Sequence, residues 1–394
     1  MDFVKIGGEG GRCRRVSPGS LPGVSGGLRT QARQELGRGV ALRGTVWPGG
    51  DEEPYDGLVV VAADGTVAAA APAGQLAVPE DLPVLGGDGC WVGPGVVDAH
   101  VHLAFGGPEH ALPAGVLAVR DLGAPRERAL AWRTPNRPEP GMPRVAVAGP
   151  VLTAPDGYPA QSWGAKGFAA FAGSAEAAAA VVRGLAADGV DLVKIALEPG
   201  AGWPVPQPPV VRAVVDAAHG CGLPVVAHAL TTDMVTRALD AGVDELAHMP
   251  VQRLTEPMVD RIAASGIPVV STLQTFFSGG QGRASAANAA DLHRAGVPLV
   301  YGTDLGNAGT RPGVDPRELD RLADAGLGRL GALRAATERA ARSAGMRGRS
   351  GRIEVGAPAE LVLLCGNPLV EPGVWRYPAA VVADGRLIRP NGCP

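Results

Sequence analysis

The chain has 394 residues, 46% of them hydrophobic, which is enough for a large buried core. Its formal net charge is only −3 and its Lys and Arg residues are spread along the chain, which argues against a nucleic-acid partner. The five cysteines form no CxxC pair, and no apolar run reaches the roughly 18 residues of a membrane-spanning helix. We therefore expect a cytoplasmic protein with neither a disulfide framework nor a membrane partner.

Residues 1–38 are rich in Gly and Arg and lack helical or strand periodicity, which predicts a disordered extension. Its basic residues are followed by Ser17-Pro18-Gly19-Ser20 rather than by an apolar signal core, which predicts a non-secretory chain. Short β-type pieces follow in residues 39–93, with Ala63-Asp64-Gly65 as a hairpin signal. They predict the first part of a small β-domain.

Residues 94–348 alternate short apolar runs with amphipathic, Ala-rich segments. Many runs follow a helical segment through a Gly-Val or Gly-Ile pair, where the glycine suits a helix end and the β-branched residue opens a buried parallel strand. Eight runs in succession predict an α/β fold, a (β/α)8 TIM barrel. The runs are 95–99, 115–120, 145–148, 190–195, 223–227, 243–246, 267–270 and 297–301, and the clearest helical segments are 174–188, 208–219, 231–241 and 255–265.

Residues 349–394 return to short β-type pieces separated by Gly, Pro and Asn. Both ends of the chain therefore carry strands outside the barrel. We expect residues 39–93 and 349–394 to pair and form one small β-sandwich domain.

An HxH pattern, His100 and His102, stands at the end of the first apolar run. Residues two apart on a strand point the same way, so both imidazoles can face one point. The pattern alone is a weak signal, because two polar residues leaving a strand would look the same.

Four more polar residues fall at the ends of predicted strands 4, 5, 6 and 8. They are Lys194, His228, His248 and Asp304. The carboxyl ends of barrel strands form the rim on which TIM-barrel active sites are built. A single buried histidine is usually structural, but four of the chain's seven histidines fall on this one rim. The joint pattern therefore favours a metal site.

The ligand types are chemically consistent with this interpretation. Neutral imidazole and carboxylate suit Zn²⁺ or another divalent transition metal. A lysine ammonium would repel that metal, so Lys194 fits as a ligand only if it is carboxylated and bridges two ions. The alternative is an ordinary barrel lysine that pairs with a carboxylate.

The order HxH, Lys, His, His, Asp on strands 1, 4, 5, 6 and 8 resembles that of the amidohydrolase superfamily. The chain is most similar to the imidazolonepropionase-related branch, which includes Xaa-Pro dipeptidase-like enzymes. The resemblance covers about residues 40–394. It rests on the segments 94–103 (PGVVDAHVHL), 119–123 (VRDLG), 191–195 (DLVKI), 226–229 (VAHA), 242–248 (GVDELAH), 302–305 (GTDL) and 351–364 (GRIEVGAPAELVLL).

The resemblance implies two metal ions, with Zn²⁺ as the expected metal. His100, His102 and Asp304 would bind the more buried ion, and His228 and His248 the other. Carboxylated Lys194 and a hydroxide would lie between them. The resemblance also implies that Asp304 acts first as general base and then as general acid.

Candidates for substrate binding lie on the loops. Relatives carry a Gly-Gly-His loop after strand 3 where this chain has Asp156-Gly157-Tyr158, so Tyr158, with Trp163 nearby, is a candidate pocket residue. The alternative for both is ordinary packing of a loop aromatic. Arg311 is a candidate to bind a substrate carboxylate, against the alternative of a solvated loop arginine.

The remaining three histidines and one charged pair are expected to have no role in the metal site. His110, His219 and His293 are expected to lie outside the site. Arg120 and Asp121, at the end of the second run, are expected to form a buried structural pair.

The sequence thus predicts a binuclear metal-dependent hydrolase that uses a metal-bridging hydroxide on a small-molecule substrate. The bond cleaved would be an amide, cyclic amide or ester-like bond, for instance in a dipeptide or an N-acyl amino acid. One alternative is a mononuclear imidazolonepropionase-like ring hydrolase or a deaminase, and another is a non-catalytic scaffold with the same fold. We also expect a homo-oligomer, as relatives often are.

Overall fold

The structure, a computed structural model, describes residues 32–133, 141–200, 202–346 and 350–389. The predicted disordered extension lies outside the described residues up to residue 31. Its last part contains β1 (Ala32–Glu35), which pairs with β18 (Arg386–Arg389). Across the described ranges, no helix has both the length and the apolar character needed to cross a membrane.

The parallel strands form two hydrogen-bonded sheets. The first has the order β6 (Val96–Val101), β7 (Val116–Asp121), β8 (Arg144–Val147). The second has the order β10 (Ala169–Phe171), β9 (Val151–Thr153), β11 (Val193–Leu197), β12 (Val225–Ala229), β13 (Glu245–Leu246), β14 (Val269–Val270), β15 (Leu299–Val300). Each of the eight predicted barrel runs overlaps one of these strands, and β9 and β10 are additional.

Backbone hydrogen bonds also link the edges of the two parallel sheets. The Ala99 N–H donates to the Tyr301 carbonyl at 3.2 Å, which joins β6 to the end of β15. The Asp191 N–H donates to the Val147 carbonyl at 2.9 Å, which joins β8 to the residues before β11. The first and last strands of the series therefore lie side by side.

The four clearest predicted helices are confirmed as α3 (Ala175–Asp188), α4 (Pro208–Gly220), α5 (Thr232–Ala241) and α6 (Glu256–Ser265). The Ser174 hydroxyl caps α3 by accepting from the Ala177 N–H. Gly189, Gly242 and Gly266 end three of these helices with positive φ, a conformation that glycine adopts without strain. The Gly-Val and Gly-Ile pairs therefore mark the turns that the sequence predicts.

Apart from the 13-residue α8, the remaining helical segments are shorter. They are α1 (Leu103–Gly106), η1 (Pro108–His110), η2 (Leu112–Ala114), α2 (Arg126–Trp132), α7 (Leu273–Ser278), α8 (Gly282–Arg294), α9 (Pro316–Leu322), η3 (Ala323–Leu327), α10 (Gly328–Arg334), η4 (Ala335–Arg339), α11 (Ala340–Ser343) and η5 (Pro372–Arg376).

The two ends of the chain meet in one eight-stranded sheet. Its order is β1-β18-β17-β16-β5-β2-β3-β4, with β2 (Val40–Val46), β3 (Tyr55–Val61), β4 (Val67–Pro72), β5 (Val84–Pro94), β16 (Leu361–Leu364) and β17 (Ala380–Ala383). The strands pair antiparallel, except that β2 and β5 are parallel. Residues before and after the barrel segment thus share one sheet, with its own buried cluster that includes Leu42, Val59 and Leu361.

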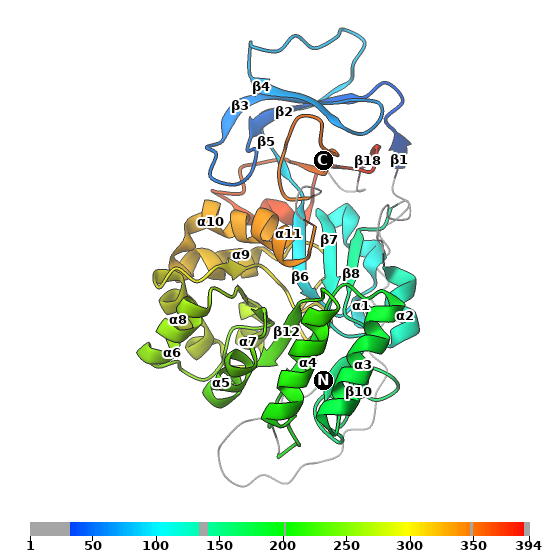
Figure 1. Ribbon diagram of the computed structural model, residues 1–394. Helices are drawn as coiled ribbons and strands as arrows, with labels where there is room; N and C mark the ends of the chain where they lie inside the picture. Colours follow the sequence, from blue (N-terminus) through cyan, green and yellow to red (C-terminus); the bar gives the residue numbers. More distant parts are fainter. Residues whose placement is uncertain (1–31, 134–140, 201, 347–349, 390–394) are drawn as a thin grey trace.

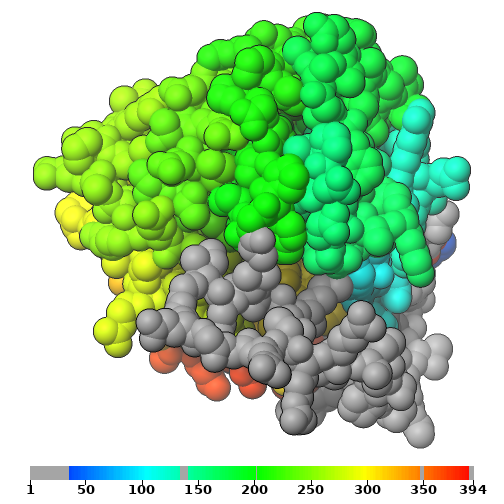
Figure 2. All heavy atoms as spheres, turned by 90° about the horizontal axis from the view of Figure 1, so that it is seen from below, coloured from blue at the N-terminus to red at the C-terminus, as the bar shows by residue number. Residues whose placement is uncertain are grey.

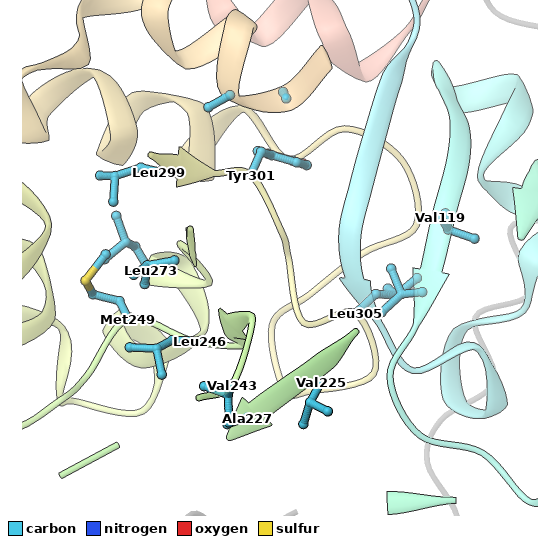
Figure 3. Close-up of a cluster of buried hydrophobic side chains, with 14 of the residues drawn as sticks. Val119, Val225, Ala227, Val243, Leu246, Met249, Leu273, Leu299, Tyr301 and Leu305 are labelled. Carbon is cyan, nitrogen blue, oxygen red and sulfur yellow. The ribbon is translucent and has the colours of Figure 1, made fainter. Parts of the chain in front are cut away.

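The larger apolar core surrounds the parallel strands. Val225 and Ala227 on β12, Leu246 on β13 and Leu299 on β15 are buried together with helix residues (Figure 3). A separate buried cluster that includes Val97, Val270 and Ala340 brings α11 against β6, β14 and their neighbours.

The chain passes directly from β5 into β6, so the parallel strands begin near the eight-stranded sheet and run away from it (Figure 1). Their carboxyl ends face the opposite side of the molecule. Seen from that side, the green to yellow-green segment that includes α3 to α6 forms much of the surface (Figure 2). The predicted metal ligands lie under this face.

Candidate metal centre

His100 and His102 bring their Nε2 atoms to one carboxylate oxygen. His100 lies on β6 and His102 directly follows it. Each ring has its Nδ1 near a backbone carbonyl, Ala247 O at 2.8 Å for His100 and Gly123 O at 3.3 Å for His102. Since a carbonyl only accepts, Nδ1 carries the proton in the neutral rings and Nε2 presents a lone pair. Those lone pairs face Asp304 Oδ1 at 3.3 and 3.4 Å.

Asp304 is held in an unusual backbone conformation. Its φ is 55°, in the left-handed region that a residue other than glycine enters only when its surroundings impose it. The Asp304 N–H donates to the His100 carbonyl at 2.8 Å, which fixes the turn after β15 against β6. Burial raises the pKa of this carboxyl to about 7. The strained turn thus aims a buried carboxylate at the two imidazoles.

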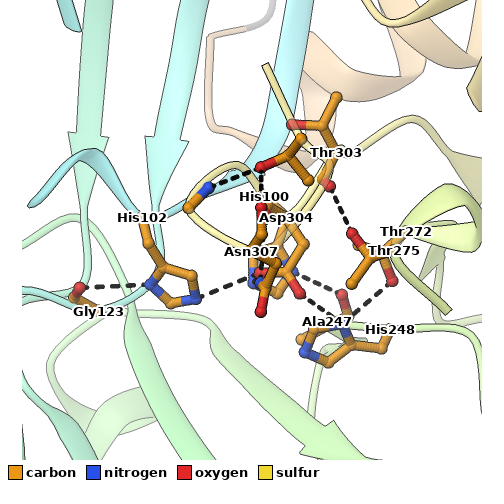
Figure 4. Close-up of polar contacts among 12 residues, drawn as sticks. His100, His102, Gly123, Ala247, His248, Thr272, Thr275, Thr303, Asp304 and Asn307 are labelled. Atoms are coloured by element: carbon orange, nitrogen blue, oxygen red, sulfur yellow. Dashed lines mark hydrogen bonds and ion pairs between the residues drawn. The ribbon is translucent and has the colours of Figure 1, made fainter. Parts of the chain in front are cut away.

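His248 and His228 lie beside the group formed by His100, His102 and Asp304. His248 Nδ1 is 3.1 Å from the Thr272 hydroxyl and 4.0 Å from Asp304 Oδ2 (Figure 4). The ring centroids of His248 and His100 are 4.4 Å apart, and those of His248 and His228 are 4.8 Å apart. The four predicted histidines therefore form one cluster.

Burial keeps these histidines neutral. It lowers the pKa of His102 to about 3 and lowers those of His100, His228 and His248 as well. A neutral imidazole is the form that ligates a metal. Each ring of the cluster therefore has one nitrogen lone pair available for a metal ion.

Lys194 lies on β11 and lines the same cavity as His102, His228, His248 and Asp304. Its side chain is buried, and its Nζ has no hydrogen-bond partner among the described residues. Burial lowers the pKa of the amine to about 7. Lys194 is thus a buried amine with a reduced tendency to be charged.

The donor set fits a metal ion. Among the described residues, His100 Nε2, Asp304 Oδ1 and Lys194 Nζ are buried and lack hydrogen bonds. His100 Nε2 and Asp304 Oδ1 are both acceptors, so neither can satisfy the other, whereas a cation between them satisfies both. His100, His102 and Asp304 are also close enough together for one atom of each to bind a single ion.

Two carboxylates that support the cluster were not identified from the sequence. Asp98 Oδ1 accepts from the backbone N–H groups of His100 and Thr303 at 3.1 and 3.0 Å. Glu198 Oε2 lies 3.1 Å from His228 Nε2, which leaves Nδ1 of that ring available as a ligand. The position of Asp98, two residues before His100 on the same strand, is the one signal that could have marked it.

Two of the loop aromatics border the cavity. Tyr158 and Trp163 line it, and the Trp163 Nε1–H donates to the Tyr158 hydroxyl at 3.0 Å. Tyr158 also stacks on Trp203, with ring centroids 5.5 Å apart, and lies 5.2 Å from the His228 ring. Arg311, in contrast, is exposed and does not contribute to the described cavity wall.

The remaining histidines lie apart from the cluster. His110 pairs with Glu109, His219 with Asp244, and His293 with the Gly326 carbonyl. The expected pair of Arg120 and Asp121 is wrong, because Arg120 forms a buried ion pair with Glu245, whereas Asp121 accepts from the Leu103 N–H. Adjacent residues on a strand point to opposite faces, so these two neighbours cannot share one environment.

Comparison with known proteins agrees with this geometry. The sequence model of the amidohydrolase family matches residues 91–387. An uncharacterised protein of Mycobacterium tuberculosis is 29% identical over 351 residues, which cover 77% of this chain and 86% of that protein. An imidazolonepropionase of Polaromonas sp. is 32% identical over 181 residues, 44% of this chain and 42% of that protein.

Solved structures show the same fold. A Xaa-Pro dipeptidase with bound methionine superposes with a TM-score of 0.76 at 20% identity, covering 89% of this chain and all of that one. A putative prolidase from Bifidobacterium longum superposes with a TM-score of 0.74 at 27% identity, covering 91% and 96% of the two chains.

Proposed function

The chain belongs to the amidohydrolase family, and from this membership we propose that it is a binuclear metal-dependent hydrolase. The observation that carries the proposal is the convergence of two imidazole Nε2 atoms on an Asp304 oxygen, with His100 Nε2 and that oxygen left without hydrogen bonds. His100, His102 and Asp304 would hold one ion, and His228 and His248 the second. Zn²⁺ suits this set of nitrogen and oxygen ligands.

Carboxylated Lys194 would be the ligand shared by both ions. Carboxylation joins CO₂ to a neutral amine with loss of a proton, so it requires a lysine that is not held as an ammonium by acidic partners. The buried Nζ of Lys194, without a hydrogen bond in the described structure, supports this assignment. The carbamate would then supply a negative charge where the bare lysine would supply a positive one.

When bound, the metals would lower the pKa of a water molecule and polarise the carbonyl that it attacks. Asp304 accepts the proton of the attacking water and returns it to the leaving group. Its carboxylate is buried at the convergence of the histidine ligands, which places it for both steps. Glu198 holds the His228 ring in one orientation through Nε2.

Tyr158 would orient the substrate. Its hydroxyl oxygen accepts from Trp163, so its own proton remains available for donation. Tyr158 lines the same cavity as Asp304 and Asn307. We propose that the Tyr158 hydroxyl donates a hydrogen bond to an oxygen of the bound substrate.

The bond cleaved would be an amide, cyclic amide or ester-like bond. The likeness to Xaa-Pro dipeptidase and prolidase structures supports amide hydrolysis, including that of dipeptides or N-acyl amino acids. The partial match to imidazolonepropionase favours a second candidate, a mononuclear ring hydrolase or deaminase. The presence of all six ligand positions argues against a non-catalytic scaffold.

A metal-removal experiment with a substrate panel tests the proposal. Dipeptides, N-acyl amino acids, lactams and esters would be offered to the purified chain before and after chelation, and after return of Zn²⁺. We expect hydrolysis that chelation abolishes and Zn²⁺ restores, and that Asp304→Asn abolishes while the exposed control Asp324→Asn does not. Full activity of Asp304→Asn would overturn the assignment.

We also propose that the two parallel sheets form one closed (β/α)8 barrel, supported by the backbone hydrogen bonds at their edges. The sheet shared by both chain ends would form the small sandwich domain. We further propose that the protein is cytoplasmic, that its partner is a small-molecule substrate, and that it forms a homo-oligomer.

A further inference from the structure

Two cysteines from opposite ends of the chain meet in the eight-stranded sheet. Cys90 lies on β5, and Cys365 directly follows β16. These two strands pair antiparallel, and the last opposed residues of the pairing are Leu364 and Trp91. One further step along the same register places Cys365 opposite Cys90. The barrel segment separates the two cysteines in the sequence, so only the fold brings them together.

The two cysteine side chains point to the same face of this sheet. Opposed residues of neighbouring strands share a face, and the faces alternate along each strand. Val92 and Leu363, the opposed pair two residues away, both belong to the buried cluster of the sheet. Cys90 packs against that cluster. Cys365 therefore lies on the side of the sheet where Cys90 lies.

The backbone geometry at this position suits a disulfide. The Gly95 N–H donates to the Glu360 carbonyl at 3.0 Å, so this opposed pair is hydrogen-bonded. Hydrogen-bonded and non-hydrogen-bonded pairs alternate along antiparallel strands. Cys90 is an odd number of residues from Gly95, so Cys90 and Cys365 form a non-hydrogen-bonded pair. The Cα atoms of such a pair are about 4.5 Å apart, within the roughly 4.4–6.8 Å that a disulfide spans.

The two side chains are close enough to interact and differ in their exposure. Burial raises the pKa of the Cys90 thiol, and the charge of the neighbouring Cys365 raises it further. Both residues are thiols in the structure, with Cys365 exposed and Cys90 half-buried. An oxidant in solution therefore reaches Cys365 directly and leaves its oxidised sulfur beside the Cys90 thiol.

We propose that Cys90 and Cys365 are an oxidation site, which a hydroperoxide converts into a disulfide within one chain. The bond joins the strand that leads into the barrel to the strand that follows the barrel. The inference is independent of the proposed hydrolase function, because neither cysteine lines the described wall of the cavity at the metal cluster.

The reaction balances with hydrogen peroxide as the oxidant. The Cys365 sulfur attacks one peroxide oxygen, the O–O bond breaks, and the other oxygen leaves as water, which gives a sulfenic acid. The Cys90 sulfur then attacks the sulfenic sulfur, the S–O bond breaks, and a second water leaves with the Cys90 proton. The two thiols lose two electrons and two protons, and one hydrogen peroxide becomes two waters.

The disulfide closes a loop that contains the whole barrel segment. A cross-link restricts the unfolded chain, and in the chain-entropy account it does so more strongly the longer the loop. We therefore expect the oxidised protein to unfold at a higher temperature than the reduced protein. The parallel strands run away from the eight-stranded sheet toward the metal cluster, so zinc content should not change (Figure 1).

Peptide mapping tests where the bond forms. The full chain carrying Cys13→Ser, Cys221→Ser and Cys393→Ser keeps only the proposed pair. After treatment with a small excess of hydrogen peroxide, alkylation and digestion without reductant, we expect one peptide pair joined through Cys90 and Cys365, which dithiothreitol separates. The wild-type chain should give the same peptide pair. Two alkylated thiols, or disulfides only between chains, would overturn the inference.

Thermal unfolding tests what the bond does. Peroxide should raise the midpoint of the wild type by roughly 3 °C or more, and dithiothreitol should reverse the rise. Cys90→Ser and Cys365→Ser should lose this response, whereas Cys221→Ser, at an exposed cysteine outside the pair, should keep it. A full response in Cys90→Ser or Cys365→Ser, or no response in a wild type that carries the mapped disulfide, would contradict the cross-link between the chain ends.

Discussion

Asp98 Oδ2 accepts a hydrogen bond from the Thr303 hydroxyl at 2.5 Å. The same carboxylate accepts from the backbone N–H groups of Thr303 and His100. One buried side chain therefore joins the strand that carries His100 to the turn that carries Asp304. The first and last of the proposed ligands in the chain, His100 and Asp304, are therefore positioned by a residue outside the proposed ligand set.

Removing this carboxylate should weaken the metal centre and the fold. Asp98→Ala leaves three buried donors without an acceptor, and we expect a loss of about 1–3 kcal/mol in the free energy of unfolding. Zinc content after dialysis should fall as well. Denaturant titration and metal analysis measure the two effects. Thr303→Ser keeps the hydroxyl and should resemble the wild type, and an unchanged Asp98→Ala protein would refute the positioning role.

Glu198→Gln should lower metal affinity with little effect on folding. The carboxylate of Glu198 orients the His228 ring and makes it more basic, and the substitution removes this negative charge. We expect zinc affinity to fall about 10- to 100-fold, because replacing the hydrogen-bond partner of a metal-binding histidine has effects of this size. Competition with a chromophoric chelator measures it. Glu53→Gln, at an exposed position, is the control and should bind zinc like the wild type.

The buried carboxyl of Glu318 should make the free energy of unfolding fall as pH rises. This fully buried carboxyl accepts from the Leu273 and Gln274 N–H groups at the start of α7, and burial raises its pKa from 4.5 to about 7. Between these values the folded state holds the proton that the unfolded state has released, so the free energy of unfolding falls as pH rises.

The pH effect is measured by denaturant titration at pH 4.5 and at pH 7. Glu318→Gln removes the titrating group. Between pH 4.5 and pH 7, the free energy of unfolding of the wild type should therefore fall by on the order of 1–3 kcal/mol more than that of the variant. Parallel pH profiles of the two proteins would show that Glu318 does not titrate in this way.

The ion pair of Arg120 and Glu245 should be essential to stability. Both side chains are buried, and Arg120 also donates to the Ser343 carbonyl at 2.8 Å. Arg120→Ala leaves a buried carboxylate without its partner, and we expect a loss of about 3–5 kcal/mol. Arg126→Ala, which breaks the more exposed pair with Asp188, should cost less than about 1 kcal/mol. Urea unfolding distinguishes the two, and equal losses would contradict the prediction.

Much of the fold could be predicted because its signals are local. A glycine after a helix and a β-branched residue at the start of a strand are neighbours in the chain, as at Gly242 and Val243. The clustering of the proposed ligands could be predicted because each lies at or near the end of an apolar run, and parallel strands bring the ends of such runs to one rim.

The rest depends on contacts between distant residues. Arg120 finds its partner 125 positions away, in Glu245, and no pattern near either residue marks the other. Glu198 becomes a partner of His228 only because β11 and β12 are adjacent. β9 and β10 were missed because both are only three residues long and lie in a segment that carries no clear strand period.

The metal content of the purified chain tests the central claim most directly. The protein, expressed with added zinc and dialysed, would be analysed by inductively coupled plasma mass spectrometry against its molar concentration. The binuclear proposal predicts two zinc ions per chain, and fewer in His100→Ala and Lys194→Ala. One ion per chain would contradict the binuclear proposal, and no bound ion would contradict the metal centre itself.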